Sequence, residues 1–71
     1  EMQPIRRYIA EQLIGKRLRF ACYCLIGIDV TGTVRDYKLR QDEILLIVEA
    51  DNGKLVDIGL NTPDLKVEPI C

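Results

Sequence analysis

Positively charged side chains are the groups in this chain best suited to bind a ligand, because a cluster of them attracts anions such as phosphate. The chain has 71 residues, with ten Lys and Arg against eleven Asp and Glu, and a net charge of −1. Residues 1–40 hold eight Lys and Arg residues and four Asp and Glu residues, whereas residues 41–71 hold two and seven. A fold that gathers the first group forms a local positive patch, and a fold that scatters it leaves an ordinary solvated surface. Both interpretations stay open.

Groups that could catalyse a reaction are scarce. The chain has no His to act as a general base. None of its Thr residues lies in a nucleophile motif, and no glycine-rich loop is present that would cradle a phosphate. We therefore expect a protein that is not an enzyme and that uses no cofactor.

The three cysteines are the remaining reactive groups, and Cys22 and Cys24 would share one face of a strand. Such a pair could ligate a metal, but the chain has no His, and Cys71 is its only other thiol. We expect no metal site and interpret the pair as small buried apolar residues of a reducing compartment. With no membrane-spanning apolar stretch and no secretory signal pattern, a cytoplasmic protein without a membrane partner is the default expectation.

A run of β-forming residues, Glu43 to Asp51, gives the clearest structural signal. It reads E-I-L-L-I-V-E-A-D, without the alternation that a half-buried strand shows. Asn52-Gly53 follows at once and predicts a two-residue hairpin turn, with Asp51 opposite Lys54. A strand that is apolar on both faces must be covered on both, and so short a chain has little of itself to do so. The run predicts a curled barrel, a neighbouring subunit, or both.

The rest of the chain predicts a helix and four further strands, in one domain over residues 1–71. Pro4 and Gly15 bound a helix over about residues 4–14. Its apolar face would cover a barrel and consists of Ile5, Tyr8, Ile9 and Leu13. Strands are expected over about residues 16–26, 30–37, 43–51, 54–60 and 65–70, with Gly32 at a bend and Pro69 on an edge. The predicted fold is mostly β, an N-terminal α-helix followed by a five-stranded, strongly bent antiparallel SH3-like barrel.

The order of these elements resembles the Sm-like family (LSm and Hfq) of ring-forming RNA-binding proteins, over residues 4–70. The second strand contains the glycine-initiated stretch G-T-V-R-D-Y at residues 32–37, and a long apolar third strand follows. Gly32, Val34 and Tyr37 match the family pattern G-x-hydrophobic-x-x-aromatic-D, in which Lys38 stands at the Asp position. Residues 40–42 read R-Q-D, without the Asn that contacts a base in the family. The second family signature is present as G-L-N at residues 59–61, without its Arg.

The resemblance implies a cyclic homo-oligomer of five to seven subunits. In Sm-like rings the fourth strand of one subunit pairs with the fifth strand of the next, which covers both open edges. Such pairing would bury apolar residues of the last three predicted strands, namely Leu45, Ile47, Val56, Ile58, Leu60, Leu65 and Val67.

The resemblance also implies binding of single-stranded RNA or DNA, with a role in RNA processing or regulation. The candidate contacts lie between the second and third strands, after the fourth strand, and on the helix: Tyr37, Lys38, Arg40, Gln41, Asn61, Thr62, Arg6 and Arg7. The connection Lys38 to Asp42 is expected to be polar and irregular. Two alternatives for the whole chain stay open: a monomeric or dimeric SH3-like module that binds structured RNA or protein, and a ring that is only a structural hub.

The aromatic and helical candidates each have a second interpretation. Tyr37 could stack on a base, which tolerates any sequence, or pack as a strand-end aromatic on the barrel. Arg6 and Arg7 could contact phosphates or be solvated charges of the helix.

Overall fold

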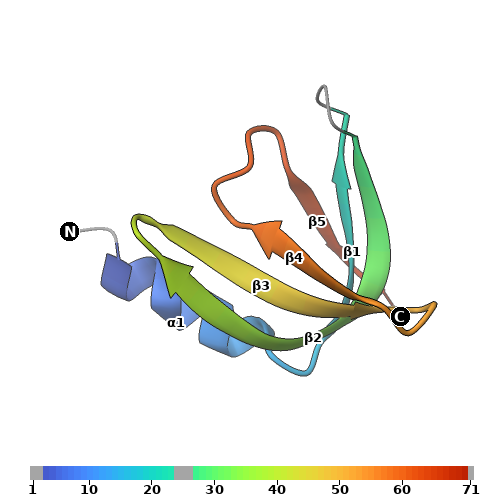
Figure 1. Ribbon diagram of the computed structural model, residues 1–71, viewed down its shortest axis with the longest axis horizontal. Coiled ribbons are helices and arrows are strands. Elements are labelled where there is room, and N and C mark those ends of the chain that lie inside the picture. Colours follow the sequence, from blue (N-terminus) through green and yellow to red (C-terminus); the bar gives the residue numbers. More distant parts are fainter. Residues whose placement is uncertain (1–2, 24–26, 71) are drawn as a thin grey trace.

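The computed structural model describes residues 3–23 and 27–70, apart from the side chains of residues 3–6. The fold is mostly β, with one N-terminal helix and a five-stranded antiparallel sheet (Figure 1). In chain order the elements are α1 (Gln3–Leu13), β1 (Arg17–Cys22), β2 (Ile28–Arg40), β3 (Glu43–Ala50), β4 (Leu55–Gly59) and β5 (Lys66–Pro69). Within the described residues, no helix is long and apolar enough to cross a membrane.

The sheet curls because β2 is strongly curved along its length (Figure 1). Gly32 of β2 lies opposite Ala50 of β3, and a Cβ added to Gly32 would overlap the backbone carbonyl of Glu49. Only glycine allows the two backbones to come this close. The register shifts between Val34 and Asp36, and such a bulge increases the local twist of a strand.

The sheet has two open edges, since the strand order is β4-β3-β2-β1-β5 and the described part of the chain shows no pairing of β4 with β5. The predicted closed SH3-like barrel is therefore not confirmed. Directly after β4, the Leu60 N–H donates to the Ile44 carbonyl oxygen at 3.0 Å. Because hydrogen-bonded positions alternate along an antiparallel pair, the backbone groups of Leu55 and Asp57 point away from β3, toward the open edge.

The other edge, β5, carries the proline predicted to lie there. The Ile70 N–H donates to the Arg17 carbonyl oxygen at 3.1 Å, so the backbones of Val67 and Pro69 point away from β1. Pro69 has no N–H to offer, and its position on the open edge leaves the β1–β5 pairing intact.

The core forms on the face of the sheet that packs against α1, here called the inner face. Its members are buried apolar side chains from the helix and the first four strands: Ala10, Leu18, Phe20, Val34, Ile44, Leu46, Val48 and Ile58. β3 places alternate residues in this core, and Leu45 and Ile47 between them lie half-buried on the opposite, outer face. The long apolar run therefore has one fully covered face and one partly covered face.

Of the described residues predicted for the apolar face of the helix, Leu13 packs against the core, whereas Tyr8 and Ile9 do not. Ala10 is fully buried and Leu13 packs against the core, whereas Tyr8 is 63% exposed and Ile9 is 46% exposed. A small side chain at the point of contact lets the helix backbone approach the sheet closely, which a pattern of large apolar residues does not reveal. The helix ends as predicted, with Gly15 at φ 89° and its N–H donating to the Val34 carbonyl oxygen at 2.7 Å.

Strand β2 is longer than the predicted 30–37, and the predicted polar connection is shorter. Residues 38–40 belong to β2, because Lys38 pairs with Leu45 and Arg40 with Glu43. The turn is only Gln41-Asp42, with Gln41 at φ 50°. Strand β1 ends at Cys22, and residues 24–26 of the predicted first strand lie outside the described residues.

The turn between β3 and β4 has three residues, not the predicted two. The Ala50 N–H donates to the Lys54 carbonyl oxygen and the Gly53 N–H to the Ala50 carbonyl oxygen, each at 2.8 Å. Ala50, not Asp51, is therefore the partner of Lys54. Gly53 at φ 87° supplies the left-handed residue of a three-residue hairpin loop, in which Asn52 occupies an ordinary turn position.

Candidate nucleic-acid interface

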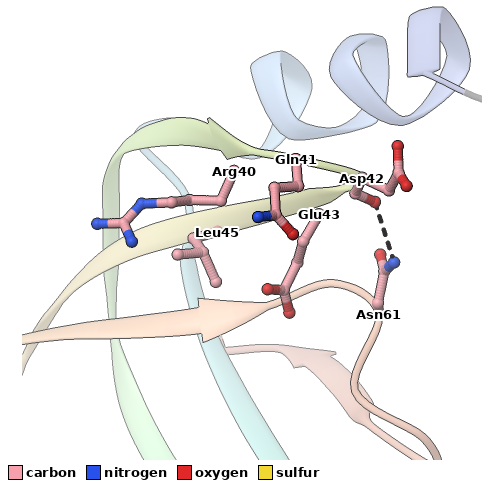
Figure 2. Close-up of a pocket in the computed structure, with 6 residues that line it drawn as sticks. All are labelled: Arg40, Gln41, Asp42, Glu43, Leu45 and Asn61. Atoms are coloured by element: carbon pink, nitrogen blue, oxygen red, sulfur yellow. Dashed lines mark hydrogen bonds between the residues drawn. The ribbon is translucent and has the colours of Figure 1, made fainter.

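A hollow of about 430 Å³ lies where the β2–β3 turn meets the chain after β4 (Figure 2). Six residues line it: Arg40, Gln41, Asp42, Glu43, Leu45 and Asn61. The Asn61 Nδ2 donates to the Asp42 backbone carbonyl oxygen at 3.3 Å and so links the two segments. Three of the predicted nucleic-acid contacts, Arg40, Gln41 and Asn61, thus meet in one place.

Strand register sets the arrangement of side chains in the hollow. Arg40 of β2 lies opposite Glu43 of β3, and Leu45 lies two residues further along β3 on the same outer face. In Figure 2 the Leu45 side chain lies between the Arg40 guanidinium and the Glu43 carboxylate. The hollow therefore offers an apolar floor with a cation toward one side and an anion toward the other.

Gly59 makes the position of Glu43 possible. It pairs with Leu45 across β3 and β4, and a Cβ at Gly59 would overlap the Glu43 carboxylate. The Glu43 side chain occupies the space that this glycine leaves, and Glu43 is half-buried as a result. The adjacent Asp42, at the turn, is exposed.

Most basic side chains of β1 and β2 form ion pairs with acidic residues of other strands or of the β3–β4 turn. The pairs are Arg17–Asp51 at 2.6 Å, Arg19–Asp29 at 3.2 Å, Arg19–Glu68 at 3.8 Å, Arg35–Glu49 at 2.7 Å and Lys38–Asp57 at 3.0 Å. These bases therefore form no positive patch. Within residues 3–23 and 27–70, Arg40 is the basic residue of these two strands without an ion pair.

The Arg19–Asp29 pair also affects ionisation. The Arg19 guanidinium donates hydrogen bonds to both Asp29 carboxylate oxygens at 3.2 Å. These bonds and the positive charge of Arg19 lower the pKa of Asp29, and the same bonds and the negative charge of Asp29 raise the pKa of Arg19.

Two predicted contacts, Lys38 and Thr62, do not line the hollow. The Lys38 Nζ lies 3.0 Å from Asp57 Oδ2, so this side chain crosses the outer face of β3 to reach β4. The Thr62 hydroxyl donates to the Gly59 carbonyl oxygen at 2.7 Å and stabilises the turn after β4. In both cases the polar atom has a partner within the protein.

Tyr37 lies on the inner face, away from the hollow. Its ring packs against the core, and its hydroxyl donates to Glu11 Oε2 of α1 at 2.9 Å. The hydrogen bond to Glu11, partial burial and the Glu11 charge raise the pKa of Tyr37. This arrangement corresponds to the packing interpretation and fastens the helix to β2.

The helix arginines are separate from the hollow. Arg7 is exposed on α1, and the Arg6 side chain lies outside the described residues. Sequence reasoning did not include Glu43, Asp42 or Leu45 among the ligand contacts. The paired register of the β2–β3 hairpin is the signal that could have indicated Glu43, because it places this residue opposite Arg40.

The residues predicted for the subunit interface differ in exposure. Ile58 is 1% exposed and belongs to the core, so it has almost no surface left to bury. The half-buried residues that pack against this core are Val56, Leu60 and Leu65. Leu45 and Ile47 lie half-buried on the outer face, and Val67 on the β5 edge is 39% exposed. Leu55 on the β4 edge, which was not predicted, is 65% exposed.

The cysteines show no metal arrangement in the part of the chain that is described, where no three His, Cys, Asp or Glu side chains gather around one point. Cys22 is buried, and its thiol donates to the Pro63 carbonyl oxygen at 3.3 Å. Cys24 and Cys71 lie outside the described residues.

Comparison of the chain with protein-family models, curated proteins and solved structures finds no match. Function is therefore inferred from the fold and the hollow.

Proposed function

We propose that this protein is a subunit of an Sm-like homo-oligomeric ring that binds single-stranded RNA, with one base held in the hollow of each subunit. The observation that carries the proposal is the meeting of the β2–β3 turn with the chain after β4, which brings Arg40, Gln41 and Asn61 together. Amide groups and an Arg side chain can hydrogen-bond the edges of an unstacked base, and a good bidentate contact is worth about 1 to 3 kcal/mol.

The two open edges support assembly. Within the described residues, β4 and β5 each direct backbone groups outward with no neighbouring strand, and exposed edges of this kind are normally covered in stable proteins. Pairing of β4 with β5 of the next copy would cover both edges and would bury Leu55 and Val67. The curled sheet would then correspond to an SH3-like barrel whose open side is covered by a neighbour.

A ring would strengthen contacts that are weak singly. Each subunit would present one hollow, and a strand held at one hollow is already close to the next, so affinity multiplies through effective concentration. The net charge is −1, and most basic side chains of the sheet are held in ion pairs, so few cationic groups are available to contact phosphates. The salt dependence of binding should therefore be shallow compared with that of a protein with many phosphate contacts.

Light scattering on the purified chain tests assembly, and titration of labelled single strands tests binding. We expect a species of five to seven times the 8.1 kDa protomer mass and binding of oligouridine, oligoadenosine or single-stranded DNA at low salt. Arg40→Ala should weaken binding, whereas the control Arg7→Ala on the helix should not. A single-protomer species, or no binding at low salt, would contradict the proposal.

Because most basic side chains of the sheet are already ion-paired, a second candidate function is a ring that acts only as a structural hub. Its distinguishing result is a ring mass with no nucleic-acid binding at any salt concentration.

A further inference from the structure

We propose that the hollow selects guanine among the four bases, with Glu43 and Arg40 reading two neighbouring edges of the ring. This inference rests on the proposed function, because it names the base that the same site takes from a single strand. It also makes Glu43 a specificity-determining residue. Without such a role, an acidic side chain in a nucleic-acid site would only weaken binding by repelling phosphate.

The carboxylate of Glu43 is the first part of the argument. An ionised carboxylate only accepts hydrogen bonds, and its two oxygens can accept two donors that lie side by side. Guanine presents such a pair, N1–H and the N2 amino group, on one edge. Uracil presents a single N3–H between two carbonyl oxygens, and these oxygens would face the carboxylate unfavourably. Adenine and cytosine each present one amino group beside a ring-nitrogen acceptor, so the second carboxylate oxygen would face an acceptor.

The guanidinium of Arg40 is the second part. Arginine donates two parallel hydrogen bonds to guanine O6 and N7, the commonest specific contact between proteins and bases. In the described part of the chain, neither Arg40 nor Glu43 has an ion-pair partner, although they lie opposite each other in register. The donor and the acceptor both stay available to a ligand.

The floor of the hollow is the third part. Leu45 lies between the two charged groups in Figure 2 and offers an apolar surface to the flat face of a base. Glu43 is half-buried and sits above Gly59, so the space for its side chain is defined, whereas Asp42 is exposed at the turn. The structure therefore assigns the reading of the base to Glu43 and not to its acidic neighbour.

The test compares strands that differ by single base atoms. Oligouridine is compared with the same strand carrying guanosine, or adenosine, at every third position, a spacing that avoids guanine quadruplexes. We expect the guanosine strand to bind about tenfold more tightly, since a good bidentate contact discriminates by this order. Inosine, which lacks the N2 amino group, and 7-deazaguanosine, which lacks N7, should each lose most of this preference.

Variants of the protein assign the two contacts. Glu43→Gln should reduce the guanosine preference and leave oligouridine affinity unchanged or raised, since the variant removes a charge that repels phosphate. The control Asp42→Asn removes the same charge from the adjacent residue and should keep the preference. Equal loss of preference in both variants would overturn the role of Glu43 in base reading.

Two further outcomes are separable. Binding of all strands with equal affinity, or a preference for uridine, would overturn the guanine inference and leave the proposed function in place. Absence of binding to every strand would overturn both. Guanosine monophosphate is included to identify the source of the base, and a mononucleotide that binds as tightly as the strand would overturn the claim that the ligand is a strand.

Discussion

The middle of the outer sheet face and the hollow at the β2–β3 turn contain the same kinds of charged side chains but arrange them differently. In the middle, Arg35 pairs with Glu49 and Lys38 with Asp57. In the hollow, Arg40 and its register partner Glu43 lie apart, toward different sides of Leu45. Paired charges are satisfied within the fold, and separated charges stay available to a ligand. The charge content of a segment therefore says little about binding until its pairing is known.

The two regions also use glycine differently. A Cβ at Gly32 would meet the backbone of β3, whereas a Cβ at Gly59 would meet the end of the Glu43 side chain. A backbone cannot move aside without disturbing the sheet, but a flexible side chain can rotate. Gly32 thus supports the fold, and Gly59 supports the shape of the hollow.

The largest expected effect is that of Gly32→Ala. The added methyl group would push β2 away from β3 next to the Arg35–Glu49 pair and destabilise the protein by about 1 to 3 kcal/mol, as overpacking does. Urea denaturation followed by circular dichroism measures this change. The control Thr33→Ala, at the next position of β2, should cost less. An unchanged midpoint for Gly32→Ala would show that β2 and β3 do not approach this closely.

Gly59→Ala should have a smaller effect on stability and a larger one on the hollow. The methyl group would displace the Glu43 carboxylate, so the free energy of unfolding should fall less than in Gly32→Ala while the guanosine preference falls. Urea denaturation and strand titration on the same preparation measure both changes. A preference equal to that of the unmodified protein would show that Glu43 reads the base from another position.

Lys38 and Arg40, two basic side chains on the outer face of β2, should affect different properties, the first stability and the second binding. Lys38→Ala breaks an exposed pair, so it should lower the free energy of unfolding by no more than about 1 kcal/mol and leave strand affinity unchanged. Arg40→Ala should lower strand affinity and leave stability unchanged. Denaturation midpoints and titrations with single-stranded RNA on both variants test whether Lys38 acts on stability and Arg40 on binding. The reverse result would mean that the ligand lies on the middle of the sheet.

The smallest effect is a pH dependence at the helix. The pKa of Tyr37 is raised in the folded protein because its hydroxyl donates to Glu11, so the folded state holds the proton more tightly than the unfolded state. This contribution to stability is complete below the unfolded pKa of about 10 and is lost as the pH rises through the folded pKa. Urea midpoints at about pH 8 and about pH 11 measure it. Tyr37→Phe should remove this part of the alkaline loss, and an identical loss in the variant would assign it to other groups.

Local signals in the sequence predicted a large part of the fold. Gly15 ends the helix, Pro69 lies on an open edge, and one helix precedes five strands in the predicted order. These features depend on the backbone preferences of single residues or on short patterns, which act in the same way wherever the chain folds.

The features that the sequence did not predict depend on contacts between distant segments. The helix contacts the sheet through Ala10, which no pattern of large apolar residues indicates. Lys38 is paired because the register of three strands brings Asp57 within reach. Tyr37 lies on the inner face because it pairs with Leu46, and there its hydroxyl donates a hydrogen bond to Glu11. Glu43 lies in the hollow because the β2–β3 turn is only two residues long, which places Glu43 opposite Arg40.

Pro69 has a consequence for the behaviour of the protein at high concentration. Along the open side of β5, its missing N–H interrupts the row of donors that an incoming chain would need, so Val67 is left as a short docking point. A foreign segment can add a few main-chain bonds there but cannot extend into a long cross-β stack. The same residue thus limits the length of any strand that adds at this edge, β4 of a second copy included.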